Sequence, residues 1–198
     1  MQRLPSEAIN FDGTFPTFSA PILEKTPWPL QSSAEGSSAV AFLFIPPVEK
    51  QGYSRLVLTK RSLSVGTHKG QIGFAGGRYD AGDLSPADTA KREVEEEIGI
   101  DRDKLQAHGV LESHKSLGGS DVVPVIMTAN VSEKDFLLNK KEVDRLFLLP
   151  WNYFSNEKAS LFSFNMFGVW RHSYLFDGAE AQVWGLTARI IKLAGLKP

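Results

Sequence analysis

The chain has 198 residues, of which 42% are hydrophobic and 23% charged, and this composition is typical of one globular domain that buries about 70% of its unfolded surface. The formal net charge of -1 gives no overall attraction to DNA, RNA or anionic lipid, so we expect neither nucleic acid nor membrane as a partner. The lack of cysteine excludes disulfides, thiolate nucleophiles and cysteine-based metal clusters. The first residues show no leader pattern and no apolar run approaches bilayer length, so we expect a soluble, cytoplasmic protein.

The first part of the chain divides into an irregular arm and a pair of strands. Residues 1–37 are rich in proline and end in S-S-A-E-G-S-S, which predicts an irregular N-terminal arm before a single domain over residues 38–198. Ala39–Ile45 is wholly apolar and stops before two prolines, so it predicts a buried strand, and Arg55–Lys60 predicts the next one. Turn residues between the two fit a hairpin.

The later part of the chain adds strands and a final helix around one central helix. Strands are predicted at 105–112 and 121–129, a late hairpin at 162–167 and 170–176, and a closing helix at 183–194. The segment 141–148 mixes charged and apolar residues and could be a strand or a helix. Phe74 and Trp184 are expected in the core. Strands on both sides of a central helix predict an α/β layered domain rather than a bundle.

The central helix is predicted to begin after Ser85, which caps it, and to end at Gly99. Within it, Glu93, Glu96 and Glu97 stand at i, i+3 and i+4 and so share one face. The adjoining stripe is apolar and predicts packing on a core: Ala87, Ala90, Val94 and Ile98. Like charges at these spacings destabilise a bare helix, and carboxylate oxygens suit hard divalent cations such as Mg²⁺. The pattern therefore favours a metal and phosphate site, and an acidic, solvated helix face is the simpler alternative.

The surrounding residues give this helix a family resemblance. Residues 92–100 read R-E-V-E-E-E-I-G-I, which matches the second half of the Nudix box, R-E-U-x-E-E-x-G-U, and the pair Gly76-Gly77 lies upstream where the loop of that box begins. The chain resembles a Nudix hydrolase. The resemblance implies the Nudix fold, a mixed β-sheet sandwiched between α-helices, and dependence on Mg²⁺ or Mn²⁺.

Upstream residues resemble one branch of that family, the coenzyme A pyrophosphatases. The branch signature is L-T-x-R-S, then G-x-x-x-F-P-G-G and D-x-x-D, and its counterparts here are 58–62, 70–77 and 80–83. One extra loop residue relative to the usual box gives Asp83 the acidic role and Gly77 the glycine role. Two positions depart from the branch, because Ala75 replaces a proline and Gly66 stands where an arginine is usual. A lost cation could weaken a contact to an extra phosphate, which puts coenzyme A specificity in doubt.

The resemblance also assigns roles to individual residues. The metal would be held by Glu93, Glu96 and Glu97 with the carbonyl oxygen of Gly76. Arg92 would tie loop to helix by pairing with Asp83 or Glu93, although an exposed pair with Asp88 is a simpler reading. The general base would be either Glu93 or a glutamate of a later loop, for which Glu142 and Glu112 are the candidates. Groups flanking the glycine loop could meet substrate phosphate: Arg61, Lys60, Lys69, His68 and Gly77.

The predicted function is a Mg²⁺-dependent pyrophosphohydrolase that cleaves coenzyme A or its derivatives to 3',5'-ADP and 4'-phosphopantetheine. A second reading keeps the chemistry and changes the substrate to ADP-ribose or a nucleoside diphosphate sugar. A third reading is a non-catalytic nucleotide sensor, although such sensors usually lose box carboxylates that are present here. The expected partner is a small nucleoside diphosphate derivative, and a homodimer is left open.

Overall fold

The computed structural model describes residues 36–49, 52–64, 66, 68–154, 158–166, 168–178 and 180–194. The predicted N-terminal arm lies outside the described residues except for positions 36 and 37. The strands are β1 Ser38–Ile45, β2 Arg55–Arg61, β3 Ile72–Gly73, β4 Gly76–Arg78, β5 Leu105–Val110, β6 His114–Lys115, β7 Asp121–Ala129, β8 Val143–Pro150, β9 Ala159–Met166, β10 Val169–Asp177 and β11 Gln182–Trp184. The helices are α2 Pro86–Ile98 and α3 Gly185–Leu193, with short 3-10 turns at Arg102–Lys104, Glu133–Asp135 and Trp151–Phe154. No helix in these ranges is long and apolar enough to span a membrane.

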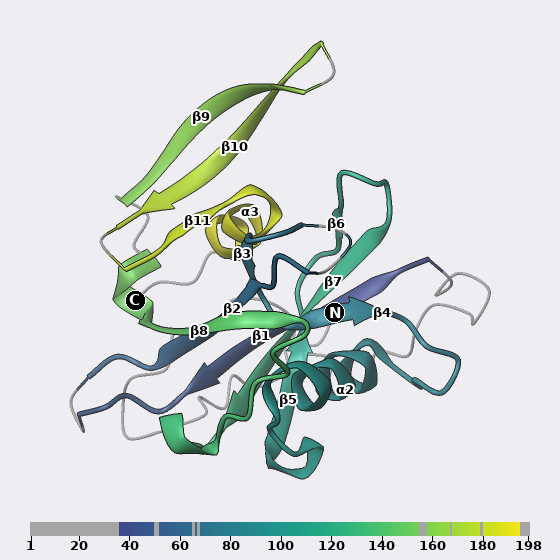
Figure 1. Ribbon diagram of the computed structural model, residues 1–198, viewed down its shortest axis with the longest axis vertical. Coiled ribbons are helices and arrows are strands. Elements are labelled where there is room, and N and C mark those ends of the chain that lie inside the picture. Colours follow the sequence, from purple (N-terminus) through teal and green to yellow (C-terminus); the bar gives the residue numbers. More distant parts are fainter. Residues whose placement is uncertain are drawn as a thin grey trace, which may run out of the picture.

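The main sheet is mixed, as predicted. Its path runs β3-β2-β1-β7-β5, with β4 beside β1, β6 beside β7 and β8 beside β2. Strands β1 and β7 are parallel, whereas the other pairs in this sheet are antiparallel. In Figure 1, α2 lies on one side of this sheet and α3 on the other. The predicted fold class, a mixed sheet between helices, is confirmed.

Strand β1 lies at the centre of the sheet and is buried on both faces. Ala41 and Leu43 belong to the core that includes Val94 of α2, whereas Phe42 and Phe44 belong to the core on the side of α3. Successive side chains of a strand point to opposite faces, so a strand covered on both sides must be apolar throughout. This explains why the predicted run has no polar alternation, and the hairpin with β2 is also confirmed.

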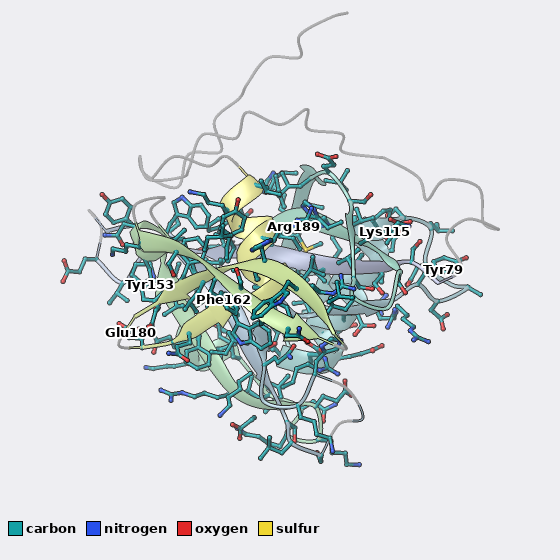
Figure 2. The ribbon with its side chains drawn as sticks, turned by 90° about the horizontal axis from the view of Figure 1, so that it is seen from above. Tyr79, Lys115, Tyr153, Phe162, Glu180 and Arg189 are labelled. Carbon is teal, nitrogen blue, oxygen red and sulfur yellow. The ribbon has the colours of Figure 1, made fainter. Side chains whose placement is uncertain are left out.

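A second, three-stranded sheet has the order β11-β10-β9. The hairpin of β9 and β10 extends beyond α3 in Figure 1. Figure 2 looks down on this side, with Phe162 of β9 and Arg189 of α3 near the middle and Tyr79 and Glu180 towards opposite ends. Of residues 141–148, left open between strand and helix, 143–148 belong to β8, which pairs with β2 along its length, whereas 141 and 142 lie in the turn before it.

The closing helix begins later than predicted. The predicted start, Val183, lies instead in β11, where it pairs with Phe176, and α3 begins at Gly185. Helical spacing of apolar residues could not reveal this strand, because the strand is only three residues long and is defined by its pairing with the preceding strand β10. Phe74 is buried as expected. The expectation for Trp184 is wrong, since it is 37% exposed with its ring edge against Phe162.

Helix α2 has the predicted boundaries because its ends are set by local contacts. The Ser85 hydroxyl accepts a hydrogen bond from the Asp88 N–H, and Pro86 takes the first helical position. Gly99 ends the helix with a φ of 74°, and its N–H donates to the Glu95 carbonyl. The helix therefore presents its apolar stripe to β1 and leaves the glutamates beside β4.

Candidate active site

Glu93 is the glutamate most closely packed against the glycine pair. It is 9% exposed, and a Cβ atom added to Gly77 would lie 2.5 Å from Glu93 Cδ and 2.8 Å from Oε2. Only a residue without a side chain leaves room for this carboxylate. Burial raises the pKa of Glu93, and the negative charges of Glu96 and Glu142 add to the rise, against the opposing effect of Arg92. This close approach gives a steric reason for the glycine that the resemblance places at position 77.

Arg92 connects the loop to the helix glutamates. Its Nε donates to Asp83 Oδ1 at 3.2 Å and its Nη2 to Asp83 Oδ2 at 3.1 Å, which is the two-pronged geometry that a guanidinium group favours. Its Nη1 donates to Glu93 at 2.8 Å and to Glu96 at 3.2 Å. Asp88 instead accepts from Ser85 at the start of the helix. Arg92 therefore fixes both the loop and the Glu93 carboxylate.

Asp83 is held ionised in this network. Burial acts to raise its pKa, but hydrogen bonds from Arg92, from the Thr89 hydroxyl and from the Asp80 N–H outweigh burial and lower the pKa below its ordinary value. The hydrogen bond that Arg92 donates to Asp83 in turn raises the pKa of Arg92. Asp83, which the family resemblance places in the acidic role of the loop, is thus the residue that pairs with Arg92.

Glu97 is the most buried glutamate and faces Arg61 at the end of β2. Glu97 is 2% exposed, and its Oε1 lies 3.5 Å from Arg61 Nη1. Its Oε2 and the Nε of Arg61 are both buried without a hydrogen-bond partner among the described residues. Burial raises the pKa of Glu97 to about 8, while Arg61 and the Gly76 N–H oppose the rise. Buried polar atoms in folded proteins are generally hydrogen-bonded, so these two atoms have capacity for a further polar contact.

The backbone of Gly76 is directed towards this carboxylate. The Ala41 N–H donates to the Ala75 carbonyl at 2.8 Å, and hydrogen-bonding direction alternates along antiparallel strands. Gly76, the next residue, therefore turns both its N–H and its carbonyl away from β1. The Gly76 N–H acts to lower the pKa of Glu97, and the N–H and carbonyl of one strand residue point to the same side, so the Gly76 carbonyl oxygen points to the side of Glu97. A Cβ atom here would lie 2.5 Å from the Ala39 carbonyl oxygen, which explains the glycine.

The turn before β8 brings Glu142 to the same site. The Asn139 N–H donates to the carbonyl of Glu97 at 2.9 Å, and the Ser62 N–H donates to the carbonyl of Glu142 at 2.7 Å. Glu142 is half-buried, and its charge contributes to the raised pKa of both Glu93 and Glu97. The flanking Lys140 donates to the Asp144 carbonyl instead. Glu142 is therefore a carboxylate beside the helix glutamates with access to solvent.

The remaining predicted residues lie further from this cluster. Glu96 has a side chain that is 51% exposed and reaches the cluster through Arg92. Lys60 pairs with Asp144 at 3.6 Å, and Lys69 is exposed in the turn before β3. Glu112 is exposed and its charge acts on His114. The structure thus joins Glu142, rather than Glu112, to the helix glutamates.

Sequence reasoning missed a role for Asn139. Its side chain donates to Glu142 Oε1 at 3.0 Å and accepts from the Lys141 N–H at 3.2 Å. An asparagine that bonds a backbone N–H two residues later is a turn signal readable from sequence. The bond to Glu142 could not be read in this way, because it depends on the fold of the turn.

The donor set fits a hard divalent cation. All candidate donors are oxygens, which Mg²⁺ and Mn²⁺ prefer, and the buried Oε2 of Glu97 has no hydrogen-bond partner in the ranges that the structure describes. Within the described part of the chain no three His, Cys, Asp or Glu side chains are gathered in a metal-binding arrangement; Arg92 instead bonds both Glu93 and Glu96. The cluster nevertheless has more carboxylates than guanidinium groups. The guanidinium groups are those of Arg61 and Arg92, and the carboxylates are those of Asp83, Glu93, Glu96, Glu97 and Glu142. A divalent cation would supply the positive charge that this excess lacks.

Comparison with known proteins relates the chain to one family. The NUDIX domain matches residues 38–166. The uncharacterized Nudix hydrolase NudL of Photorhabdus laumondii is 33% identical over 176 residues, covering 85% of this chain and 89% of the relative. NudL of Pectobacterium atrosepticum is 35% identical over 147 residues, covering 72% of this chain and 74% of the relative. The crystal structure of DR0079 from Deinococcus radiodurans has a TM-score of 0.50 at 15% identity, covering 81% of this chain and 84% of that one, a likeness of fold alone.

Proposed function

This chain belongs to the Nudix family of hydrolases, which cleave pyrophosphate bonds and generally use divalent metal ions, and we propose that its substrate is coenzyme A or a coenzyme A derivative. The products would be 3',5'-ADP and 4'-phosphopantetheine. The observation that carries this proposal is the pairing of Arg61 with Glu97. Arg61 belongs to the L-T-x-R-S element typical of the coenzyme A branch, and the ion pair makes that element part of the acidic site.

We assign the metal ligands to Glu93, Glu96 and Glu97 with the carbonyl oxygen of Gly76. The direction of the Gly76 carbonyl and the unpartnered Oε2 of Glu97 support this assignment. When bound, the ion neutralises phosphate oxygens and lowers the pKa of a water molecule. Glu96 would need to leave Arg92 and turn towards the other ligands, which its exposed side chain allows.

The protein's own groups orient the reaction and move the proton. Arg92 holds Glu93 in place and is itself held by Asp83. We assign the general base to Glu142, because it is half-buried beside Glu97 and keeps access to solvent. Glu142 takes a proton from the attacking water while the water oxygen bonds to phosphorus and the bridging P–O bond breaks. The electron pair of that bond leaves with the departing phosphate group.

The substrate phosphates would meet the cations of the glycine loop. Arg61 lies at the site, and Lys69 is free to reach a bound anion from its exposed turn. Lys60 would have to exchange its Asp144 partner for phosphate. The substitutions at Ala75 and Gly66 favour the second candidate substrate class, ADP-ribose or a nucleoside diphosphate sugar, because neither of those carries the 3'-phosphate of coenzyme A.

The experiment that tests the substrate compares kcat/KM for coenzyme A, ADP-ribose, NADH and nucleotide sugars with Mg²⁺ present. We expect coenzyme A to rank first and to release 3',5'-ADP. A higher kcat/KM for ADP-ribose would overturn the coenzyme A proposal and leave the pyrophosphohydrolase chemistry intact. Tight nucleotide binding without turnover of any substrate would instead indicate a sensor.

Gly66 provides a matched variant for the same comparison. A Cβ atom added to Gly66 would meet no atom of the described residues within 4 Å, so Gly66→Arg restores the usual cation of the branch at low steric cost. If a 3'-phosphate binds nearby, the variant should raise kcat/KM for coenzyme A about tenfold and leave that for ADP-ribose unchanged. Equal changes for both substrates would argue against a 3'-phosphate contact at this loop.

A further inference from the structure

The turn that carries Glu142 is anchored to α2 through the backbone of Asn139. The Asn139 N–H donates to the Glu97 carbonyl at 2.9 Å, one of the last carbonyls of the helix, which have no partner within the helix itself. The Asn139 carbonyl accepts from the N–H groups of Glu142 at 2.9 Å and Val143 at 2.8 Å. The position of the turn therefore follows the end of the helix that carries Glu93 and Glu97.

The same turn is fixed on its other side by the end of β2. The Ser62 N–H donates to the Glu142 carbonyl at 2.7 Å, and the Ser64 hydroxyl donates to the Lys141 carbonyl at 3.0 Å. The backbone of Glu142 is thus held from two elements. Its side chain still has rotatable bonds that these contacts leave free, and the like charges of Glu93 and Glu97 repel its carboxylate.

The Asn139 side chain restricts the rotation of the Glu142 side chain. Its Oδ1 accepts from the Lys141 N–H at 3.2 Å, and its Nδ2 donates to Glu142 Oε1 at 3.0 Å. One end of the amide therefore orients the other end, because an amide plane is rigid. The amide nitrogen of Asn139 thus contacts the Glu142 carboxylate, and its amide oxygen contacts the backbone N–H of Lys141.

We propose that Asn139 is a positioning residue that holds the Glu142 carboxylate at the reacting site, an inference that rests on the proposed role of Glu142 as general base. The hydrogen bond from Nδ2 occupies Oε1, and Glu142 takes the proton from water with its other oxygen. A base that is free to rotate spends less time within hydrogen-bond reach of the water, so loss of this bond lowers kcat. Substrate binding does not use the bond, so KM is unaffected.

Asn139→Asp removes the donor half of the Asn139 amide and keeps the acceptor half. The variant keeps an oxygen for the Lys141 N–H and keeps the backbone bonds of the turn, but it replaces the donor to Glu142 with an oxygen that cannot donate and whose negative charge repels the Glu142 carboxylate. The matched control is Asn165→Asp in the β9–β10 hairpin, where Oδ1 likewise accepts from the N–H of Gly168 at 3.0 Å. With the best substrate of the panel, we expect Asn139→Asp to lower kcat about 10- to 100-fold with KM within about twofold. The control should keep wild-type kcat, and both variants should keep the wild-type Tm and Mn²⁺ affinity.

The double variant decides whether Asn139 acts through Glu142. Glu142→Gln should lower kcat by about 100-fold or more, and adding Asn139→Asp to it should lower kcat no further. Two results overturn this inference and leave the base assignment intact. The first is a wild-type kcat for Asn139→Asp when Glu142→Gln has a lowered kcat. The second is that Asn139→Asp lowers kcat by the same factor in the Glu142→Gln background as in the wild type. Wild-type kcat in Glu142→Gln would remove the base assignment and this inference together. A parallel fall in Tm for Asn139→Asp would show a structural role instead and also overturn it.

Discussion

Gly77→Ala tests whether the glycine pair exists to make room for Glu93. The added Cβ would lie 2.5 Å from Glu93 Cδ, whereas ordinary contact begins at 3.4 Å, so the carboxylate must retreat by about 1 Å. The φ of Gly77 lies in a range open to alanine, so the backbone itself is not strained. The substitution therefore moves one functional group and leaves the strand in place.

The expected loss is large for activity and small for stability. Displacing Glu93 breaks the 2.8 Å hydrogen bond from Arg92, which costs about 2 kcal/mol, and the lower entropy of the unfolded chain returns about 0.7 kcal/mol. The net change of about 1 kcal/mol corresponds to a fall in Tm of about 2–4 °C. A misplacement of about 1 Å at the reacting centre can lower kcat/KM about 100-fold.

Gly76→Ala is the contrasting variant at the adjacent position. Its Cβ would lie 2.5 Å from the Ala39 carbonyl oxygen and 2.7 Å from Val40 Cα, and these backbone atoms belong to the central strand. Overpacking against atoms that cannot rotate away costs about 3 kcal/mol, or about 6–12 °C in Tm. Thermal melting and kcat/KM with Mg²⁺ are measured on both variants. Wild-type kcat/KM in Gly77→Ala, or a fall in its Tm equal to that of Gly76→Ala, would refute the reasoning.

Two further predictions concern the charges of the site. Burial raises the pKa of Glu97 to about 8, so in chelator-treated protein its ionisation opposes folding increasingly as pH rises from about 4.3, its unfolded value, to about 8. The Tm of Glu97→Gln should therefore exceed that of the wild type, and this difference in Tm should widen across this pH range and stay constant above it. A difference in Tm that does not change with pH would contradict the assigned burial of Glu97. Arg92→Lys removes the forked contact with Asp83 and should lower kcat/KM more than tenfold. Its control, Arg102→Lys in the exposed pair with Glu95, should change neither kcat/KM nor Tm, and similar effects of the two variants would count against the role of Arg92.

Features set by neighbours in sequence were predicted well. Ser85 and Gly99 determine the ends of α2 because a cap acts within one helical turn. The wholly apolar run that forms most of β1 predicted a buried strand, and the structure covers this strand on both faces. The glutamates on one face of α2 and the arginine that pairs with Asp83 also follow from spacing and motif.

Features set by contacts outside the element itself were not. Residues 182–184 form β11 and not the first turn of a helix because they pair with the preceding strand β10. Residues 143–148 of the segment left open become part of β8 because they pair with β2, which is distant in sequence. Glu96 shares a helix face with its neighbours, yet it is exposed while Glu97 is buried, since burial depends on which elements cover each part of that face.

The sequence by itself determined the family, the helix with its caps and the kind of ligand that its carboxylates suit, because these depend on residue type and on spacings of a few residues. Only the tertiary structure decided which charged groups lie close together: Arg61 with Glu97, and Glu142 with the helix glutamates. The reason is physical. Desolvation and Coulomb interaction depend on distance and burial in space, and chain segments far apart in sequence are brought into contact only by packing of the sheet and its helices.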